Sequence, residues 1–313
     1  MKKYVTILLM NKRKQQDKIL FRYVIYTIYG WFLFFTLITA VFLIFIVTLP
    51  FMLLFDKDRV FFSYLVKWFA QMFFFFYYTE WLTYEGNGLK PPKKGEKRIY
   101  VINHASQFDV VLMYMLPGPI KFLFKKKWAK KPLIGWVARL GKNLIVDEEM
   151  TAAELLLVFR GAEHYLENKI PFVIYPEGTR SHSGKIEKFA LGSFKLALEN
   201  GADIVPVVFD SWNAIRPGGL WIRDQYTRVR VLDTIKYEDF DHLNFGKVSH
   251  IVRMKMIQGL LDLRDDRRLK EKNYYRKIPK FEAVDDEMRA EVKEMEEYCK
   301  KKNIYLKSEM PQA

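Results

Sequence analysis

The sequence has a single cysteine, Cys299, among its 313 residues. One thiol excludes a disulfide within the chain and fits a reducing compartment. A lone cysteine near the end of the chain is also a poor candidate for a catalytic nucleophile. We therefore expect no chemistry that depends on Cys299.

The chain has too few acidic residues to balance its basic ones. It contains 51 Lys and Arg against 36 Asp and Glu, which gives a formal net charge of +15. Such a charge favours either nucleic acid or an anionic membrane surface as the partner. The sequence contains no zinc-knuckle, RNP or helix-turn-helix motif. Most of its 26 phenylalanines fall in the first 80 positions, so we expect membrane lipids and no nucleic acid as partners.

Charged residues are absent from positions 23–55, a run of 33 residues. This run is longer than a signal-peptide core of about 7–15 residues. As one helix it would extend about 50 Å, against a hydrocarbon thickness of about 30 Å. Tilting, or a break at Pro50, would absorb the excess. Residues 1–22 carry seven Lys and Arg against one acid, Asp17, which predicts a cytoplasmic N-terminus.

A second apolar stretch follows at 60–79 and is interrupted by Lys67. It is either a second membrane span or an aromatic helix lying in the membrane interface. The remaining alternative is that both stretches are core helices of a soluble protein. The rest of the chain is basic, and if it faces the cytoplasm the chain must enter the membrane and return. We therefore predict that residues 1–80 form a helical hairpin anchor, with the following domain on the cytoplasmic side.

Residues 81–236 alternate short β-rich runs with longer helical patterns, which is typical of an α/β sheet covered by helices. A segment rich in glycine, proline and lysine (86–98) predicts a linker or surface loop before it. Helices are expected at 149–168 and at 187–200, the second ending at Gly201. Strands are expected at 98–104, 120–125, 142–147, 170–177, 202–210 and 228–233.

Residues 237–313 have a different pattern. Two charge-dense amphipathic helices are expected near 248–264 and 284–302. No known motif stands in this segment, and we predict a helical C-terminal extension.

The stretch NHASQFD (103–109) places a histidine and an aspartate at the exit of an expected strand. Positions five apart on one continuous helix point about 140° away from each other. His104 and Asp109 can therefore meet only if His104 precedes a helix and Asp109 lies in its first turn, with Ser106 as the N-cap. A capping box from Ser106 to Asp109, without catalytic meaning, explains the same residues. A zinc site and a serine nucleophile fit less well, because the stretch has one imidazole and lacks a G-x-S-x-G elbow.

A second polar turn, YPEGTRS (175–181), follows another apolar run. Gly178 turns the chain, so that Glu177, Thr179 and Arg180 are displayed at the end of the expected strand. A charged surface turn without function would have the same composition. Its combination with the histidine stretch favours a functional site, because chemistry in α/β folds collects where strands end.

Together these motifs resemble those of the glycerolipid acyltransferases, most closely the 1-acyl-sn-glycerol-3-phosphate (lysophosphatidate) acyltransferases. The resemblance covers about residues 80–235. Glu148 stands where that family usually has an arginine, and Trp128 where it usually has a leucine. The four blocks of the family have counterparts in NHASQFD, KKKWAKKPLIGW (125–136), YPEGTR and IVPVV (204–208).

The resemblance implies a mixed α/β sheet flanked by helices and an enzyme of phospholipid biosynthesis. Such an enzyme transfers a fatty acyl chain from acyl-CoA or acyl carrier protein to the hydroxyl of lysophosphatidic acid, giving phosphatidic acid, without a cofactor or a metal. His104 would be the general base, oriented by Asp109. The lysophospholipid acceptor would be bound by Lys125, Glu177, Gly178, Thr179 and Arg180.

Two alternative functions remain open. The same fold could act on another lysophospholipid or on glycerol 3-phosphate, or the chain could be a non-catalytic, lipid-binding membrane tether. Six lysines and no acid occupy residues 121–131, which predicts contact with anionic headgroups or with the phosphates of an acyl donor, with Trp128 at the interface. A solvated surface would also tolerate this charge.

Overall fold

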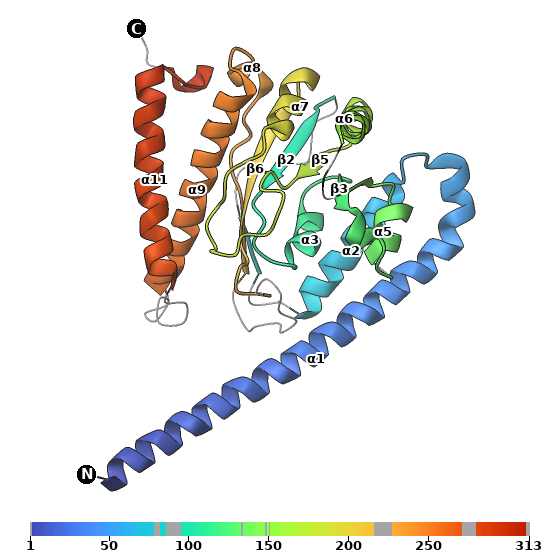
Figure 1. The fold of residues 1–313 in the computed structure, drawn as a ribbon. Helices are drawn as coiled ribbons and strands as arrows, with labels where there is room; N and C mark the ends of the chain where they lie inside the picture. The colour runs from blue at the N-terminus through green and yellow to red at the C-terminus, as the bar shows by residue number, and fades with distance from the viewer. Residues whose placement is uncertain are drawn as a thin grey trace.

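The computed structural model describes residues 2–77, 82–85, 95–132, 134–147, 149, 151–215, 227–270 and 280–310, with the backbone alone described for 2–20, 22, 23, 77 and 82–85. Most of the expected linker at 86–98 lies outside these ranges, as does Glu148. Figure 1 shows an α/β body from which one long N-terminal helix extends.

Seven strands of the described chain form one mixed sheet, in the order β1-β7-β6-β2-β5-β3-β4. β7 runs antiparallel to β6, and the other neighbouring pairs are parallel. All six predicted strands are present, and β1 was not predicted. The α/β fold class and the mixed sheet are thus confirmed. The strands are β1 (Leu82–Glu85), β2 (Arg98–Ile102), β3 (Lys121–Lys125), β4 (Leu144–Val146), β5 (Phe172–Ile174), β6 (Asp203–Asp210) and β7 (Thr227–Val231).

Helices cover both faces of the sheet, because strand residues point alternately to its two sides. Tyr100 and Ile102 of β2 belong to one hydrophobic cluster with residues of α2 and α3, whereas Ile99 and Val101 belong to another with residues of α6, α7 and α9. The shorter helices are α3 (Asp109–Leu112), η2 (Met113–Met115), α4 (Lys126–Ala129), α5 (Ile134–Leu140), α6 (Ala152–Glu167), α7 (Gly192–Asn200), α8 (Tyr237–Phe240) and η3 (Lys307–Glu309).

The ends of α6 and α7 follow from the local sequence. Thr151 and Glu154 form a capping box at the start of α6, in which each side chain accepts the backbone N–H of the other residue. At the end of α7, Gly201 adopts left-handed angles (φ +59°, ψ +40°). The predicted helix end at this glycine is therefore confirmed.

The N-terminal helix α1 (Lys2–Phe55) contains Pro50 and continues past it, so the break considered from the sequence is not found. Within the described residues, its segment Val24–Phe55 is the one helix that is long and apolar enough to cross a membrane, by length and composition alone. Phe32, Val47 and Leu54 are among its exposed large side chains. A continuous apolar surface of this kind marks a contact with lipid or with another protein.

The second apolar helix, α2 (Val60–Tyr77), packs on the α/β body along one side. Phe69 and Phe73 are buried there, whereas Trp68 and Phe75 on the other side are exposed. α2 therefore shares a core with the sheet, and its crossing of a membrane stays a prediction.

A buried lysine fastens α2 to the sheet. Nζ of Lys121 on β3 donates to the hydroxyl of Ser63 on α2 (3.2 Å), to the carbonyl of Arg59 (3.2 Å) and to the carbonyl of Gly141 (2.6 Å). Burial lowers the pKa of Lys121 to about 7. These three acceptors tie the turn between α1 and α2 to the sheet.

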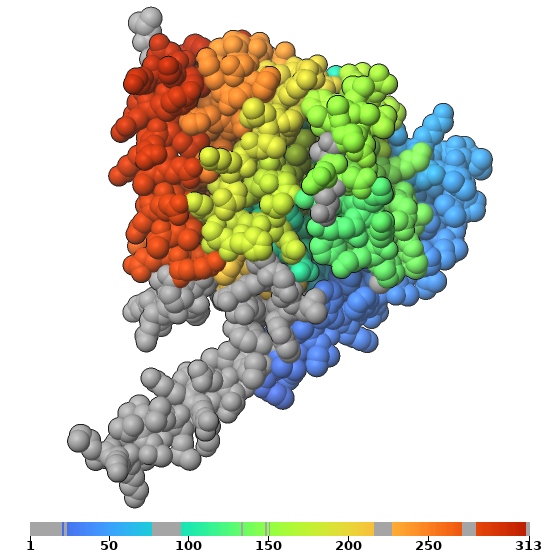
Figure 2. Space-filling model, in the orientation of Figure 1, coloured from blue at the N-terminus to red at the C-terminus, as the bar shows by residue number. Residues whose placement is uncertain are grey.

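Both predicted C-terminal helices are present and longer than expected. α9 (Phe245–Lys270) packs on β6, with Val252, Met256 and Leu260 buried, and α11 (Lys280–Lys302) packs on α9. The residues after 236 thus share the core of the sheet. Figure 2 shows these helices, coloured orange to red, on the opposite flank of the molecule from the blue α1.

Candidate active site

Three neighbouring parallel strands, β2, β5 and β3, end at one edge of the sheet. His104 lies two residues after β2, Glu177 lies three residues after β5, and Lys125 is the last residue of β3. The carboxyl edge of parallel strands is where α/β folds place ligands. The strand order therefore brings together segments that are far apart in the sequence.

His104 and Asp109 meet as their spacing predicted. Nδ1 of His104 lies 2.8 Å from Oδ2 of Asp109, and α3 begins at Asp109. Because a carboxylate only accepts hydrogen bonds, Nδ1 is the donor, and in the neutral imidazole the lone pair therefore lies on Nε2. The His104 side chain is 18% exposed, and that of Asp109 is 0% exposed. The pair therefore presents the imidazole, and not the carboxylate, toward solvent.

The buried carboxylate of Asp109 is held by several donors. Oδ2 also accepts the backbone N–H groups of Ala105 and Ser106, each at 2.7 Å. Oδ1 accepts the hydroxyl of Ser211. A buried carboxylate without such donors would be strongly destabilising. The same donors fix its orientation and, through it, the direction of the imidazole.

The predicted N-cap role of Ser106 is wrong. Phe108 precedes α3 with helical angles, and no side chain caps the helix. The Ser106 hydroxyl instead donates to the carbonyl of Ile215 (3.0 Å) and accepts the N–H of Ile215 (3.3 Å). Asp109 does accept the N–H of Ser106, so half of the capping box exists. Its carboxylate also holds His104, so the box alone does not account for Asp109.

The turn that carries His104 is anchored to β6 through Asn103. Oδ1 of Asn103 accepts the N–H of Phe209 (2.7 Å), and Nδ2 donates to the carbonyl of Phe209 (3.0 Å). An amide paired with both backbone groups of one residue fixes the backbone beside it. This role of Asn103 was not predicted, although the residue stands in the first motif.

Glu177 lies behind the histidine. Oε1 accepts the N–H of His104 (2.8 Å), and Oε2 accepts the N–H of Glu187 (2.9 Å). Loss of solvent around the carboxyl raises the pKa of Glu177 to about 7, although the two N–H groups favour its ionised form. Both oxygens are thus already engaged with the protein. The structure gives Glu177 a contact with the His104 backbone, and its contact with the acceptor stays a prediction.

The turn after β5 displays the remaining predicted residues. Gly178 has a φ of +69°, which favours glycine, and its N–H donates to the carbonyl of Tyr175 (3.0 Å). Gly178 and Thr179 are exposed. The N–H of Ser181 donates to the carbonyl of His104 (2.7 Å). This hydrogen bond joins the turn directly to the histidine turn.

Arg180 lies against the lysine-rich segment. Its guanidinium carbon is 5.9 Å from the ring centroid of Trp128 on α4, and Nζ of Lys131 is 4.5 Å from the same centroid. Nη1 of Arg180 is shielded from solvent and has no hydrogen-bond acceptor among the described residues. A buried donor without an acceptor is costly. The position of Arg180 therefore suits an anion.

Lys125 and the lysines after it belong to the segment that carries Trp128. Lys125 immediately precedes α4 and is half-buried. Lys126 forms an exposed ion pair with Asp147 (2.7 Å). Throughout the described residues, no three His, Cys, Asp or Glu side chains are grouped as metal ligands. The arrangement offers a base with an open nitrogen beside a set of cations.

Comparison with known proteins shows which proteins this region resembles. The Acyltransferase family model matches residues 84–210. Residues 84–210 are thus similar to the acyltransferases, and we refer to them as the matched acyltransferase domain. The match includes every residue that the sequence predicted for the site.

Curated relatives of the acyltransferase domain are named as lysophosphatidate acyltransferases. The 1-acyl-sn-glycerol-3-phosphate acyltransferase of Cocos nucifera is 29% identical over 160 residues, 50% of this chain and 51% of the relative. The beta enzyme of that name from Homo sapiens is 26% identical over 151 residues, 48% of this chain and 53% of the relative. The chain spans about half the length of these curated relatives.

A solved structure shares the fold. The 1-acyl-sn-glycerophosphate (LPA) acyltransferase from Thermotoga maritima aligns with a TM-score of 0.61 at 21% identity, over 78% of this chain and 96% of that one. The family model matches 127 residues (84 to 210). The structural alignment covers 78% of this chain and therefore extends beyond them.

Two contacts of the pair formed by His104 and Asp109 were missed from the sequence. Ser211, the residue after β6, donates to Asp109 from just outside the matched acyltransferase domain. Its place at the carboxyl end of the strand beside β2 could have indicated it. Tyr175 donates to the carbonyl of Asp109 (3.0 Å), and its ring centroid is 4.5 Å from that of His104. Burial raises the pKa of Tyr175 well above its usual value, so it stays a neutral donor.

Proposed function

We propose that this chain transfers a fatty acyl group from acyl-CoA or acyl carrier protein to the free hydroxyl of lysophosphatidic acid, giving phosphatidic acid for phospholipid biosynthesis. The observation that carries the proposal is the hydrogen bond of His104 to buried Asp109, which leaves Nε2 as an acceptor at the edge of the sheet. The names of the curated relatives support the same acceptor.

The reaction needs no nucleophile from the protein. The acceptor hydroxyl gives its proton to Nε2 of His104 while its oxygen attacks the thioester carbonyl, which forms the new C–O bond. Asp109 stabilises the imidazolium that results. The tetrahedral intermediate then breaks its C–S bond, and the imidazolium returns the proton to the departing thiolate. An ester and a free thiol leave, and His104 is neutral again.

Arg180 supplies the acceptor specificity in this proposal. Its planar guanidinium can donate two parallel hydrogen bonds to a phosphate, and its Nη1 has no acceptor among the described residues. Lys125 adds positive charge from the end of β3. An acceptor without a phosphate would leave these cations unpaired, which favours lysophosphatidic acid over neutral lysolipids.

Membrane attachment through α1 belongs to the same proposal. The acceptor is a lipid, and the exposed apolar segment Val24–Phe55 would insert in the bilayer that contains it. The basic residues before this segment favour a cytoplasmic N-terminus, with the acyltransferase domain on the cytoplasmic side. Carbonate extraction of membranes containing the full chain should leave the protein in the pellet. Recovery in the soluble fraction would contradict an integral anchor.

A substrate panel tests the proposed reaction. The full chain, purified in mixed micelles, is assayed with lysophosphatidic acid, lysophosphatidylcholine and glycerol 3-phosphate, each with an acyl-CoA and with acyl carrier protein as donor. We expect the highest kcat/KM with lysophosphatidic acid. A higher value with another acceptor would replace the proposed substrate. No transfer with any pair would favour the lipid-binding tether.

A further inference from the structure

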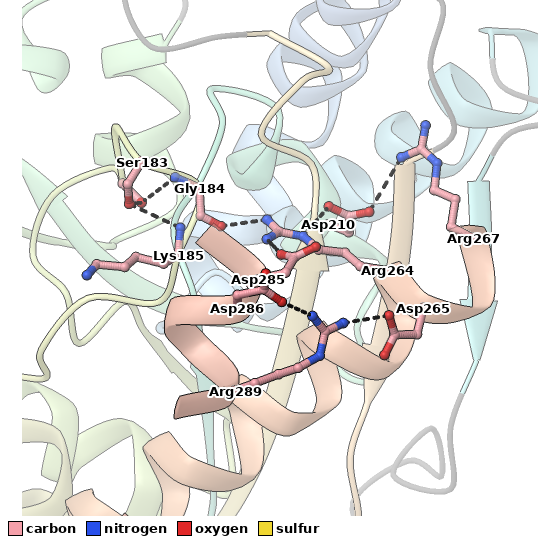
Figure 3. A network of polar contacts seen from close by, with 11 residues as sticks. Ser183, Gly184, Lys185, Asp210, Arg264, Asp265, Arg267, Asp285, Asp286 and Arg289 are labelled. Atoms are coloured by element: carbon pink, nitrogen blue, oxygen red, sulfur yellow. Dashed lines mark hydrogen bonds and ion pairs between the residues drawn. The ribbon is translucent and has the colours of Figure 1, made fainter. Parts of the chain in front are cut away.

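A buried arginine of the C-terminal helices lies between Gly184, Asp210 and Asp285 (Figure 3). Arg264 of α9 donates through Nη1 to Asp285 of α11 (2.5 Å) and through Nη2 to the carbonyl of Gly184 (2.5 Å). Its Nε lies 3.5 Å from Oδ1 of Asp210, the last residue of β6. The side chain of Arg264 is 1% exposed. One guanidinium therefore joins four segments of the chain.

Stability alone is a weak explanation for this cluster. Burying a guanidinium and two carboxylates has a large desolvation cost, which their mutual attraction largely offsets, and apolar residues of similar size often serve equally well. The fork of an arginine, however, sets the direction of each partner. The distinctive property of Arg264 is thus the geometry that it imposes on Gly184 and Asp210.

The contact at Gly184 is too close for any side chain. Gly184 has a φ of +92°, and a Cβ at this position would lie 2.6 Å from the ring of Phe281. Phe281 in turn lies under Arg264, whose guanidinium carbon is 3.9 Å from the ring centroid. The backbone at Gly184 therefore contacts both C-terminal helices, α9 through Arg264 and α11 through Phe281.

A second arginine of α9 holds the same loop farther along. Nη2 of Arg253 donates to the carbonyl of Ile186 (2.8 Å), and Nε donates to the carbonyl of Glu187 (2.8 Å). Its Nη1 donates to Glu291 of α11 (2.8 Å). Residues 181–187, which we name the clamped loop, are thus held at two points by α9.

The clamped loop holds His104 from both sides. Its first residue, Ser181, donates its N–H to the carbonyl of His104 (2.7 Å), and the Ser181 hydroxyl accepts the N–H of Gly184 (3.0 Å). Its last residue, Glu187, donates its N–H to Glu177, which accepts the N–H of His104. Both backbone polar groups of His104 therefore depend on the clamped loop, directly or through Glu177.

We infer that Arg264 and Arg253 are positioning residues for the acyl transfer: through the clamped loop they set His104 and Arg180, which immediately precedes the loop. This inference rests on the proposed function for its kinetic consequences. It assigns a role in the site to helices that lie outside the matched acyltransferase domain.

Substitution by lysine separates positioning from charge. Arg264→Lys keeps the buried positive charge between Asp210 and Asp285 but removes the fork that also reaches Gly184. We expect the acceptor KM to rise about tenfold and kcat to fall about tenfold, with the donor KM unchanged. Arg289→Lys is the matched control, because Arg289 also joins α9 to α11, through Asp265 and Asp286, but its side chain is 33% exposed. Arg253→Lys provides a second variant if Arg264→Lys does not fold.

Amide hydrogen exchange gives a readout that does not depend on activity. The N–H groups of His104, Ser181 and Glu187 should exchange faster in Arg264→Lys and in Arg253→Lys than in Arg289→Lys. Each variant is measured at the same interval below its own melting temperature. Wild-type exchange at these three amides together with a wild-type acceptor KM would overturn the inference. If the variants exchange faster but the wild-type protein acylates no acceptor, the proposed function is overturned. The structural role of the two arginines would then still hold.

Discussion

The two turns that form the site differ in how completely the protein encloses them. In the base turn (103–109), Asn103, Ser106 and Asp109 are buried and hydrogen-bonded within the chain. In the acceptor turn (175–181), Gly178 and Thr179 are exposed, and Arg180 keeps a donor without an acceptor among the described residues. A general base needs one fixed orientation, whereas an acceptor must enter and leave. In terms of the proposed function, the chain fixes its own base and leaves a donor of Arg180 for the acceptor.

The largest effect is expected from the base turn itself. His104→Asn retains an N–H that can donate to Asp109, so the melting temperature should stay near that of wild type. The base is lost, and kcat should fall by about 10²–10⁴-fold. His164→Asn is the control, because His164 forms a similar but exposed pair with Asp58 (2.9 Å). If His104→Asn kept more than about a tenth of wild-type kcat, His104 would not be the general base.

The acceptor turn should respond in KM more than in kcat. Arg180→Ala removes a charged contact worth about 1.5–3 kcal/mol, which lowers kcat/KM for lysophosphatidic acid by about 10- to 150-fold. The donor KM should change little, and Arg180→Lys should restore part of the loss. Steady-state kinetics with each substrate varied separately measures this, with exposed Arg160→Ala as the control. Equal losses for both substrates would take Arg180 out of the phosphate site.

Glu177 belongs to the acceptor turn but holds the base turn, so its replacement should affect both. Glu177→Gln turns an amide donor toward the N–H of either His104 or Glu187 and breaks that hydrogen bond. We expect a loss of about fivefold in kcat/KM for each substrate. Glu163→Gln, at an exposed glutamate, is the control. Loss confined to the acceptor would mean that Glu177 contacts the substrate after all.

The same residue predicts a pH dependence of stability. The pKa of Glu177 is raised by loss of solvent from 4.5 to about 7 in the folded protein. A carboxyl with a raised folded pKa stabilises fully below its unfolded pKa, and this contribution is lost as pH rises through the folded pKa. The melting temperature of wild type, relative to Glu177→Gln, should therefore decrease between about pH 4.5 and pH 7. A difference that is constant with pH would contradict this.

The smallest effect is expected from Ser211→Ala, which removes one of the donors to Asp109 and leaves those on Oδ2. We expect kcat to fall a few-fold, with both KM values unchanged. Ser193→Ala, at another buried serine, controls for the loss of a hydroxyl. A KM change without a kcat change would show that Ser211 acts on binding and not on the base.

The sequence predicted those features that depend on local pattern. The strands followed from apolar runs, and the meeting of His104 with Asp109 followed from their spacing at the start of α3. It did not predict the hydrogen bonds of Ser106 with Ile215 and of Glu177 with His104, because the packing of segments far apart in the sequence brings these partners together. For the same reason the sequence analysis, which expected a charge-dense helix near 248–264, did not single out Arg253 and Arg264. β1 was missed because a four-residue strand at a sheet edge has almost no period to detect.

The position of β1 has a consequence for biosynthesis. Leu82 pairs with Thr227, and β1 lies at the edge of the sheet with β7 as its neighbour. Residue 82 leaves the ribosome long before residue 227 is synthesised. β1 therefore has no β7 to pair with while most of the chain is being made. Long-range pairings of this kind form slowly, and an unpaired edge strand is prone to pair with other chains. We expect the sheet to close beside the N-terminal helices as a late folding step, after translation has passed β7.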